Sequence, residues 1–376
     1  GSYDVTVSKN GDLYAVWENE IYKVTLDSNR YASSTSTSAA TTATTAANPS
    51  TVYAYYSTGW YKNVNESNSP WNIEGATKIT SITKPTMTGY RFDGFYTGKA
   101  GTGTQVVNLD GTFVSNTPTI ITTATTLYAK WTANTYTITL DSKYYATSST
   151  TTGTAVTSAG TAAVYEKYAT GFYTTSACTT TIATITKPTY TGYTFGGYYT
   201  GKVGTGDQVI DATGKITATN TKWASNTTIY AKWTANRYSV AFNANGGTYS
   251  STPATAWALY DSKNYYTTET GSTAYTFVAP TRAGYTLLGY ADSSTATTAN
   301  YITYSGSAFT VAKNWNKAAT TTLYAVWSGN SYTITVNNNG GSGGAVNSTS
   351  YTTKAASQNF SLTLPTRTGY SFTGWS

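Results

Sequence analysis

Hydrophobic and polar residues alternate in short runs along this chain. In residues 136–140, Tyr-Thr-Ile-Thr-Leu, the large apolar side chains fall on one side of an extended backbone and the threonines on the other. Such alternation predicts a half-buried β-strand. Residues 22–26, 238–242 and 332–336 repeat the pattern. We therefore expect one kind of strand at four places in the chain.

Two longer motifs accompany these strands. The first, Leu-Tyr-Ala-Lys-Trp or a close variant, ends at residues 17, 131, 233 and 327, and the second, Pro-Thr-x-x-Gly-Tyr-x-(Phe or Leu)-x-Gly-aromatic, spans residues 85–95, 188–198, 280–290 and 365–375. Both are predicted to be strands, and the glycine that recurs at 94, 197, 289 and 374 predicts a β-bulge or a close backbone approach. Repeated aromatic positions are most simply explained as core. The predicted core residues are Trp17, Trp131, Trp233, Trp327, Tyr90, Phe92, Tyr193, Phe195, Tyr285, Leu287, Tyr370 and Phe372.

The order of the two motifs predicts the domain organisation. Inside the chain the Pro motif comes first and the Trp motif closes each unit, which predicts repeats at residues 20–134, 135–236 and 237–330. Residues 331–376 then read as the N-terminal half of a split repeat, and residues 1–19 as its C-terminal half. We expect either one period of a longer tandem array or a subunit whose tail completes the head of the next.

The segments between the motifs are less regular. A Ser/Thr/Ala-rich stretch, longest at residues 31–50, predicts a loop. An aromatic segment follows at residues 52–61 and 164–173, with a looser copy at 259–266, and its periodicity fits a short helix or a hairpin equally well. Three-residue links such as Thr-Ala-Asn join one unit to the next, so neighbouring units are expected to have little freedom.

Composition narrows the class of protein. Charged residues make up 10% of the chain, against roughly 25% in an average globular protein, whereas 36 Tyr and 10 Trp indicate folded units rich in strands. The net charge of +7 is dispersed, without the Lys/Arg run that a nucleic-acid or membrane-surface patch requires. No apolar run approaches the roughly 20 residues of a membrane span. We expect neither nucleic acid as a partner nor membrane insertion in this fragment.

The sequence offers little chemistry for catalysis. There is no His, and the single cysteine, Cys178, excludes an intrachain disulfide. The glycine-rich residues 98–103 and 201–206 lack the residue order of a phosphate-binding loop and are predicted to be hairpin loops. A Ser–Lys arrangement remains open, whereas Lys–Asn crosslinks at Lys130 and Lys232 are not a requirement of the fold, because Val16 and Val326 occupy the same place. We predict no catalytic, cofactor-binding or metal-binding residues, and therefore no enzyme.

The motifs quoted above resemble the Listeria–Bacteroides repeat family, which is related to the B repeats of internalin-type surface proteins. The likeness covers three full units and the two halves. It implies a small β-grasp-like domain, with a mixed sheet and in some members one short helix, strung in tandem on extracellular bacterial surface proteins. The family carries no catalytic residues. Successive Trp motifs lie 114, 102 and 94 residues apart here, so the units carry insertions.

These observations predict a mostly-β tandem-repeat protein that acts as an extracellular structural or adhesive rod or filament, with copies of itself as partner. The alternative is an adhesin module that binds glycans or a host receptor through unit-specific aromatic residues. The candidates for such ligand contact are Trp71, Trp223 and Trp257, with Trp315 as a further exposed candidate. Trp60 aligns with Phe172 and is predicted to be core. Residues 65–67, 226–228 and 347–349 fit N-glycosylation acceptors.

Overall fold

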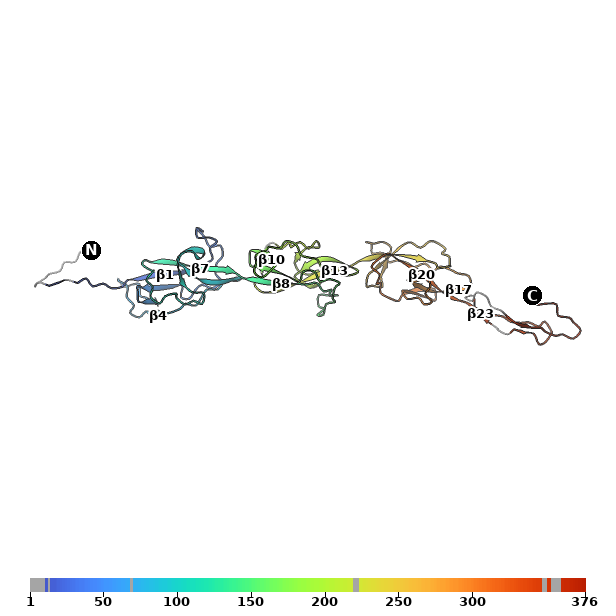
Figure 1. The fold of residues 1–376 in the computed structure, drawn as a ribbon. Helices are drawn as coiled ribbons and strands as arrows, with labels where there is room; N and C mark the ends of the chain where they lie inside the picture. Colours follow the sequence, from blue (N-terminus) through green and yellow to red (C-terminus); the bar gives the residue numbers. More distant parts are fainter. Residues whose placement is uncertain (1–10, 13, 68–69, 219–222, 347–349, 353–359) are drawn as a thin grey trace. The chain divides into compact units, whose positions relative to one another are not determined.

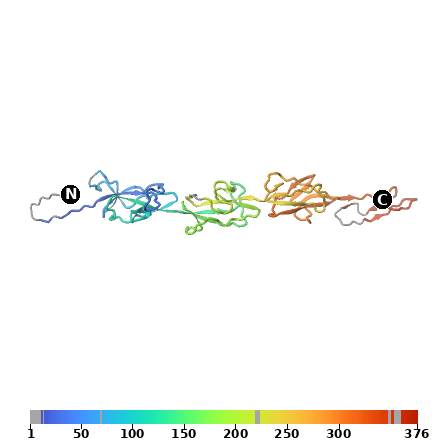
Figure 2. The ribbon, with the colours of Figure 1, turned by 90° about the horizontal axis from the view of Figure 1, so that it is seen from above.

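The computed structural model describes residues 11–12, 14–67, 70–218, 223–346, 350–352 and 360–376 (Figure 1, Figure 2). Contacts divide the chain into two compact units. The first comprises Gly1–Asp141, Thr161–Ile185 and Gly214–Ile229, and the second comprises Ser142–Gly160, Thr186–Thr213 and Tyr230–Ser376. The described residues form strands, turns and loops, and the sequence-based prediction of a mostly-β fold is confirmed.

The first sheet contains seven strands in the order β4-β3-β2-β1-β7-β5-β6. They are β1 (Ile21–Asp27), β2 (Thr51–Tyr55), β3 (Gly59–Lys62), β4 (Thr77–Ile79), β5 (Tyr90–Tyr96), β6 (Gln105–Val107) and β7 (Thr125–Ala133). Strands β1 and β7 are parallel, and the other neighbours are antiparallel. The Trp-motif strand β7 therefore lies between the opening strand β1 and the Pro-motif strand β5.

Two further sheets repeat this arrangement. The second has the order β10-β9-β8-β13-β11-β12 and consists of β8 (Thr135–Asp141), β9 (Ala163–Lys167), β10 (Gly171–Tyr173), β11 (Tyr193–Tyr199), β12 (Gln208–Ile210) and β13 (Thr227–Ala235). The third has the order β16-β15-β14-β20-β17-β18-β19 and consists of β14 (Arg237–Asn243), β15 (Ala256–Leu259), β16 (Tyr265–Tyr266), β17 (Tyr285–Ala291), β18 (Ile302–Ser305), β19 (Ala308–Val311) and β20 (Thr321–Gly329). In each, the closing strand separates the opening strand from the Pro-motif strand.

The aromatic segment that sequence left undecided forms a hairpin. Strands β2 and β3 pair with Tyr53 opposite Tyr61, and β9 and β10 pair with Tyr165 opposite Tyr173. Ser57 turns the first hairpin with a φ of 55°. Cross-strand aromatic pairs stabilise the extended form. The described residues contain two 3₁₀ turns, Lys99–Gly101 and Lys202–Gly204, and no α-helix, so the helix that the resemblance allowed is not seen among them. Nor does any described helix have the length and apolar character needed to cross a membrane.

The recurrent glycine of the Pro motif forms the predicted bulge. The register of β5 on β7 shifts between Phe92 and Gly94, and Gly94 has a φ of 121°. A Cβ at Gly94 would lie 2.4 Å from the carbonyl oxygen of Val107 on β6. Both the conformation and the close approach therefore require glycine. Gly289 occupies the same place on β17, where the register also shifts.

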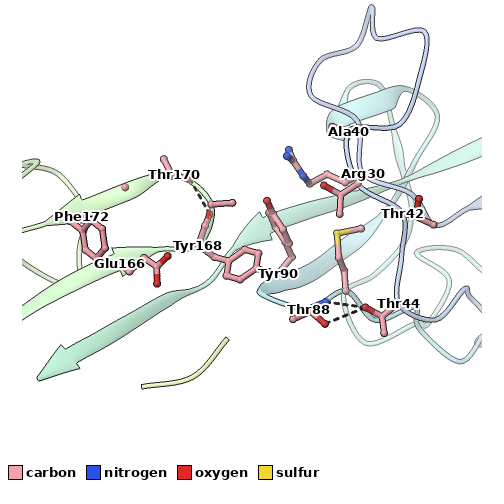
Figure 3. Close-up of a pocket in the computed structure, with 14 residues that line it drawn as sticks. Arg30, Ala40, Thr42, Thr44, Thr88, Tyr90, Glu166, Tyr168, Thr170 and Phe172 are labelled. Carbon is pink, nitrogen blue, oxygen red and sulfur yellow. Dashed lines mark hydrogen bonds between the residues drawn. The ribbon is translucent and has the colours of Figure 1, made fainter. Parts of the chain in front are cut away.

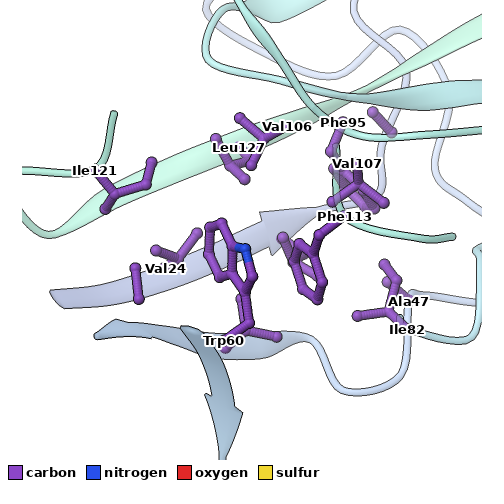
Figure 4. Close-up of a cluster of buried hydrophobic side chains, with 14 of the residues drawn as sticks. Val24, Ala47, Trp60, Ile82, Phe95, Val106, Val107, Phe113, Ile121 and Leu127 are labelled. Carbon is purple, nitrogen blue, oxygen red and sulfur yellow. The ribbon is translucent and has the colours of Figure 1, made fainter. Parts of the chain in front are cut away.

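Aromatic side chains fill the cores. In the first sheet Trp60 is 1% exposed and stacks on Phe113 with ring centroids 4.3 Å apart (Figure 4), which confirms its predicted place in the core. In the core of the third sheet Trp315 is fully buried, so it is not a candidate for ligand contact. Its indole N–H donates to the carbonyl oxygen of Lys317 at 2.7 Å, which satisfies the one polar group of the buried ring.

The two glycine-rich loops join antiparallel strands, as predicted, and each places a lysine between tyrosines. The ammonium of Lys202 lies 4.5 Å from the ring of Tyr145 and 5.6 Å from that of Tyr230, and donates to the carbonyl oxygen of Thr150 at 2.7 Å. Lys99 makes the same three contacts in the first sheet. These lysines fasten the Ser/Thr-rich loop to the sheet.

Candidate strand-acceptor site

The closing tryptophan of each complete sheet makes the same hydrogen bond. The indole N–H of Trp131 donates to the carbonyl oxygen of Ser28, that of Trp233 to Ser142, and that of Trp327 to Ala244, at 2.9–3.0 Å. Each acceptor lies just after the opening strand. The bond therefore ties the last strand of a unit to its first.

In the third sheet the ring of Trp327 requires a glycine beside it. A Cβ at Gly247 would lie 2.5 Å from Cζ2 of Trp327. The turn before Gly247 contains Asn245 with a φ of 48°. The guanidinium of Arg282 lies over the ring of Tyr285, 3.9 Å from its centroid. Turn, glycine and stacked arginine together frame the space that the indole ring occupies.

Residues 331–376 build the same frame. They contain the short strands β21 (Ser331–Thr333), β22 (Ala345–Val346), β23 (Ser350–Thr352) and β24 (Leu362–Thr363). Asn339 repeats the left-handed turn with a φ of 43°, and Arg367 lies over Tyr370 at 4.2 Å. Gly341 stands where Gly247 does, but the nearest atoms to a Cβ there are the carbonyl oxygens of Thr366 and Asn338 and Cβ of Arg367, with no ring among them. Among the described residues, no indole is one of these three nearest contacts of Gly341, whereas Cη2 of Trp375 would lie 2.8 Å from a Cβ at Gly344.

This half of a sheet leaves apolar side chains uncovered. Tyr370 is 68% exposed and Phe372 39%, whereas Phe92, the counterpart of Phe372, is 5% exposed. Tyr370 and Phe372 were predicted to be core residues, and in this chain they are not buried. The physical reason is that β21 pairs with β23 and β22 with β24, and no other described strand pairs with these residues to cover them.

The cavity beside Phe372 has a volume of about 280 Å³. Asn338, Gly341 and Trp375 are among its lining residues. The side-chain oxygen of Asn338 and the indole nitrogen of Trp375 are buried there without a hydrogen-bond partner among the residues that the structure describes. Unsatisfied buried polar atoms cost free energy, so this region has capacity for further contacts.

Residues 14–17, which carry the first Trp motif, are also exposed. Tyr14 is 82% exposed, and Val16 and Trp17 are each 89% exposed. The described residues 11–20 form no strand, although they carry the Trp motif that forms β7, β13 and β20 elsewhere. The prediction that Trp17 is core is therefore not met within this chain, because burial of its ring requires neighbouring strands.

The remaining predicted core residues lie in the three complete sheets. Phe195 is 8% and Leu287 6% exposed. The closing tryptophans are half-buried, and Phe92 and Phe195 contact Trp131 and Trp233 edge to face at 5.6 Å. The half-buried tyrosines of the Pro motif are Tyr90, Tyr193 and Tyr285.

Tyr90 belongs to a polar pocket within the first unit (Figure 3). Its volume is about 440 Å³, and Arg30, Thr44 and Glu166 contribute to its lining. The guanidinium of Arg30 lies 5.0 Å from the centre of the Tyr90 ring, and Tyr168 contacts that ring edge to face at 5.3 Å. The pocket is thus formed where the Pro-motif strand meets the hairpin that follows β8.

Glu166 on β9 is a buried carboxylate that sequence reasoning missed. It is 2% exposed, and the backbone N–H of Trp223 donates to it at 3.2 Å. Burial raises the pKa of this carboxyl to about 7. Ala54 and Ala258 occupy the same place in the other sheets. The available signal was the inward position of Glu166 in the alternating run Val-Tyr-Glu.

The candidate ligand-facing aromatics are all half-buried. Trp71 contacts Tyr53 edge to face at 5.9 Å, and Trp223 contacts Phe172 at 6.2 Å. Trp257 lies on β15 and pairs with Tyr266. They come from separate loops and strands, and no pocket described above contains all three. Within the residues that the structure describes, no group of three His, Cys, Asp or Glu side chains forms a metal-binding cluster.

Comparison with known families bears out the resemblance in three segments. Residues 63–130, 160–232 and 332–376 match the Listeria-Bacteroides repeat domain. The third sheet lies outside these segments but has the same strand order at its centre. No curated protein and no solved structure matches the chain. The structure thus defines a tandem-repeat β protein in which three segments are similar to the Listeria-Bacteroides repeat domain.

Proposed function

We propose that this chain is a structural repeat protein of a bacterial surface, which assembles head to tail into filaments by strand addition. One observation carries the proposal. Residues 331–376 retain Gly341, the glycine that accommodates a tryptophan ring, while Trp17 in a matching strand sequence is 89% exposed. The family match supports a surface or structural role.

The physics of unpaired strands supports self-assembly. Sheet edges with free N–H and C=O groups template the addition of another strand. A donor at residues 14–19 and an acceptor at residues 331–376 are different surfaces, so their contact is heterologous. Heterologous contacts that do not close into a ring produce filaments.

The remaining features agree with this role. The parallel pair of opening and closing strands supports the β-grasp-like relationship that the resemblance implies. A chain with 10% charged residues and many hydroxyl-bearing side chains suits an extracellular structural protein. The proposal includes no catalytic activity, no cofactor and no metal.

Sedimentation velocity and electron microscopy of the purified 376-residue chain test the proposal. We expect species larger than the 40.0 kDa chain that grow with protein concentration, and filaments at the highest concentrations. A single species of 40.0 kDa at every concentration would contradict head-to-tail assembly.

The second candidate function is glycan or host-receptor binding. The half-exposed rings of Trp71, Trp223 and Trp257 favour it, because partly exposed aromatic faces stack on sugar rings. A glycan array probed with the chain and with its three Trp→Ala variants tests this function. Binding that each substitution weakens would support it, and absent or unchanged binding would dispose of it.

A further inference from the structure

The three complete sheets specify where the added strand must lie. We propose that residues 14–19 of a second copy enter the acceptor with Trp17 opposite Phe372 and with its indole N–H donating to the carbonyl oxygen of Asn338. The inference rests on the proposed function and adds the register of the strand and the residues that recognise it.

The register follows from repeated pairs. Phe92 lies opposite Trp131, Phe195 opposite Trp233, and Leu287 opposite Trp327. We call the sheet that residues 331–376 of one copy and residues 14–19 of a second copy would form the split sheet. Its equivalent pair is Phe372 with Trp17. One residue further along, Arg91 lies opposite Thr132, which places Glu18 opposite Ser371. A one-residue slip would turn every donor side chain to the other face.

The parallel side of the strand gives the same register. Asp27 lies opposite Tyr128 in the first sheet, and Asn243 lies opposite Tyr324 in the third. The equivalent pair is Asn337 with Tyr14. Two independent neighbours of the incoming strand therefore assign it one position.

The acceptor is shaped for the indole ring of Trp17. Gly341 takes the place of Gly247, where a side chain would collide with Trp327. Asn338 takes the place of Ala244, whose carbonyl oxygen accepts the indole hydrogen bond of Trp327. Gly374 keeps a positive φ of 152° at the position of the bulge, and no described atom lies within 4 Å of a Cβ built there. Donor residue Val16 falls opposite this bulge, as Val326 falls opposite Gly289.

A second contact completes the junction. In the first unit the Tyr168 ring covers Gly89, where a Cβ would lie 2.4 Å from it. The N–H of Asn134 donates to the carbonyl oxygen of Gly89, and the N–H of Tyr168 donates to that of Asn134, both at 2.9 Å. In the second unit, Gly192, Asn236 and Tyr260 repeat this arrangement.

The split sheet holds both halves of this second contact. Gly369 has the matching φ of 80°, and no atom of the described residues lies within 4 Å of a Cβ built on it. The N–H of Tyr56 already donates to the carbonyl oxygen of Glu20 at 2.9 Å, as that of Tyr168 does to Asn134. In the assembled pair, the Tyr56 ring of the second copy covers Gly369 of the first. The N–H of Glu20 of the second copy donates to the carbonyl oxygen of Gly369 of the first.

Disulfide trapping tests the register. Two chains are made in a Cys178→Ser background, one with Glu18→Cys and the other with Ser371→Cys. Directly opposite residues have Cα atoms roughly 4.5–5.5 Å apart, which suits a disulfide. Mixing under mild oxidation is expected to give a crosslinked pair of about twice 40.0 kDa on a non-reducing gel, while neither variant does so alone. The matched control replaces Glu18→Cys by Asn19→Cys, whose side chain points to the other face.

The outcomes separate the inference from the proposed function. Crosslinking of Glu18→Cys with Ser371→Cys, at least tenfold faster than that of the control, supports the assigned register. Assembly by sedimentation with equal or faster crosslinking of the control overturns the register and leaves head-to-tail assembly standing. Neither crosslink nor assembly, with the sheets folded by circular dichroism, overturns both.

Discussion

The indole nitrogen of Trp131 lies 3.0 Å from the carbonyl oxygen of Ser28, although 103 residues separate them in sequence. This hydrogen bond joins the closing strand of the first sheet to the end of its opening strand. Because Trp233 and Trp327 make the same bond, it is a property of the unit and not of one loop. The long insertions between the two strands leave it unchanged.

Trp131→Phe is expected to lower the free energy of unfolding of the first sheet by about 1–2 kcal/mol. The ring packing on Phe92 is largely kept, while the hydrogen bond is lost and the carbonyl group of Ser28 is left without this donor. Denaturant unfolding followed by circular dichroism measures the change. Val114→Ala, which truncates a 54% exposed side chain, is the control and should have little effect. A shift no larger than the control's would argue against the role of the bond.

Trp17→Ala is expected to abolish assembly without changing the stability of the monomer. The Trp17 side chain is 89% exposed, so its removal leaves no cavity in the chain itself. Sedimentation velocity and thermal unfolding are measured on the variant and on Val114→Ala. Undiminished assembly of Trp17→Ala would show that the tryptophan is not the recognised residue.

Glu166→Ala is expected to stabilise the second sheet at pH 8 by about 1–3 kcal/mol, because an ionised carboxylate is no longer buried. Burial raises the folded-state pKa to about 7, whereas the unfolded value is about 4.3. The folded state therefore binds more protons between these values, and the stability of the natural chain falls as pH rises from about 4.3 to 7.

Unfolding free energies measured between pH 4 and 8 check this sign. The Glu166→Ala variant should lack this part of the pH dependence, as should Glu166→Gln, which keeps a similar shape. A natural chain whose second-sheet stability rises between pH 5 and 7 would contradict the raised pKa of Glu166.

Lys202→Met is expected to loosen the Ser/Thr-rich loop of the second sheet. The substitution removes a hydrogen bond to Thr150 and a cation–π contact with Tyr145, together about 1–2 kcal/mol. Amide hydrogen exchange in residues 143–158 should accelerate by roughly five- to thirty-fold. Lys187→Met, at an exposed position, serves as the control. Equal exchange in both variants would show that Lys202 does not hold the loop.

In the three complete sheets, the alternation of side chains by itself indicated the strands of the repeated motifs and the apolar face of each. It identified the opening strands, the two motifs and the bulge at Gly94, because each depends on residues close in sequence. It could not choose between helix and hairpin at residues 52–61. That choice rests on cross-strand pairs such as Tyr53 with Tyr61, which form only when the backbone folds back.

Burial was decided by tertiary structure. Trp17 belongs to a repeated motif and Trp315 does not, yet Trp315 is fully buried and Trp17 is 89% exposed. Glu166 lies on an inward face that sequence would reserve for an apolar residue. Periodicity states which side of a strand is apolar, whereas burial depends on whether another strand, distant in sequence, covers that side. For Trp17 and Phe372 the described chain supplies no such strand, and this is why their pattern alone could not predict their exposure.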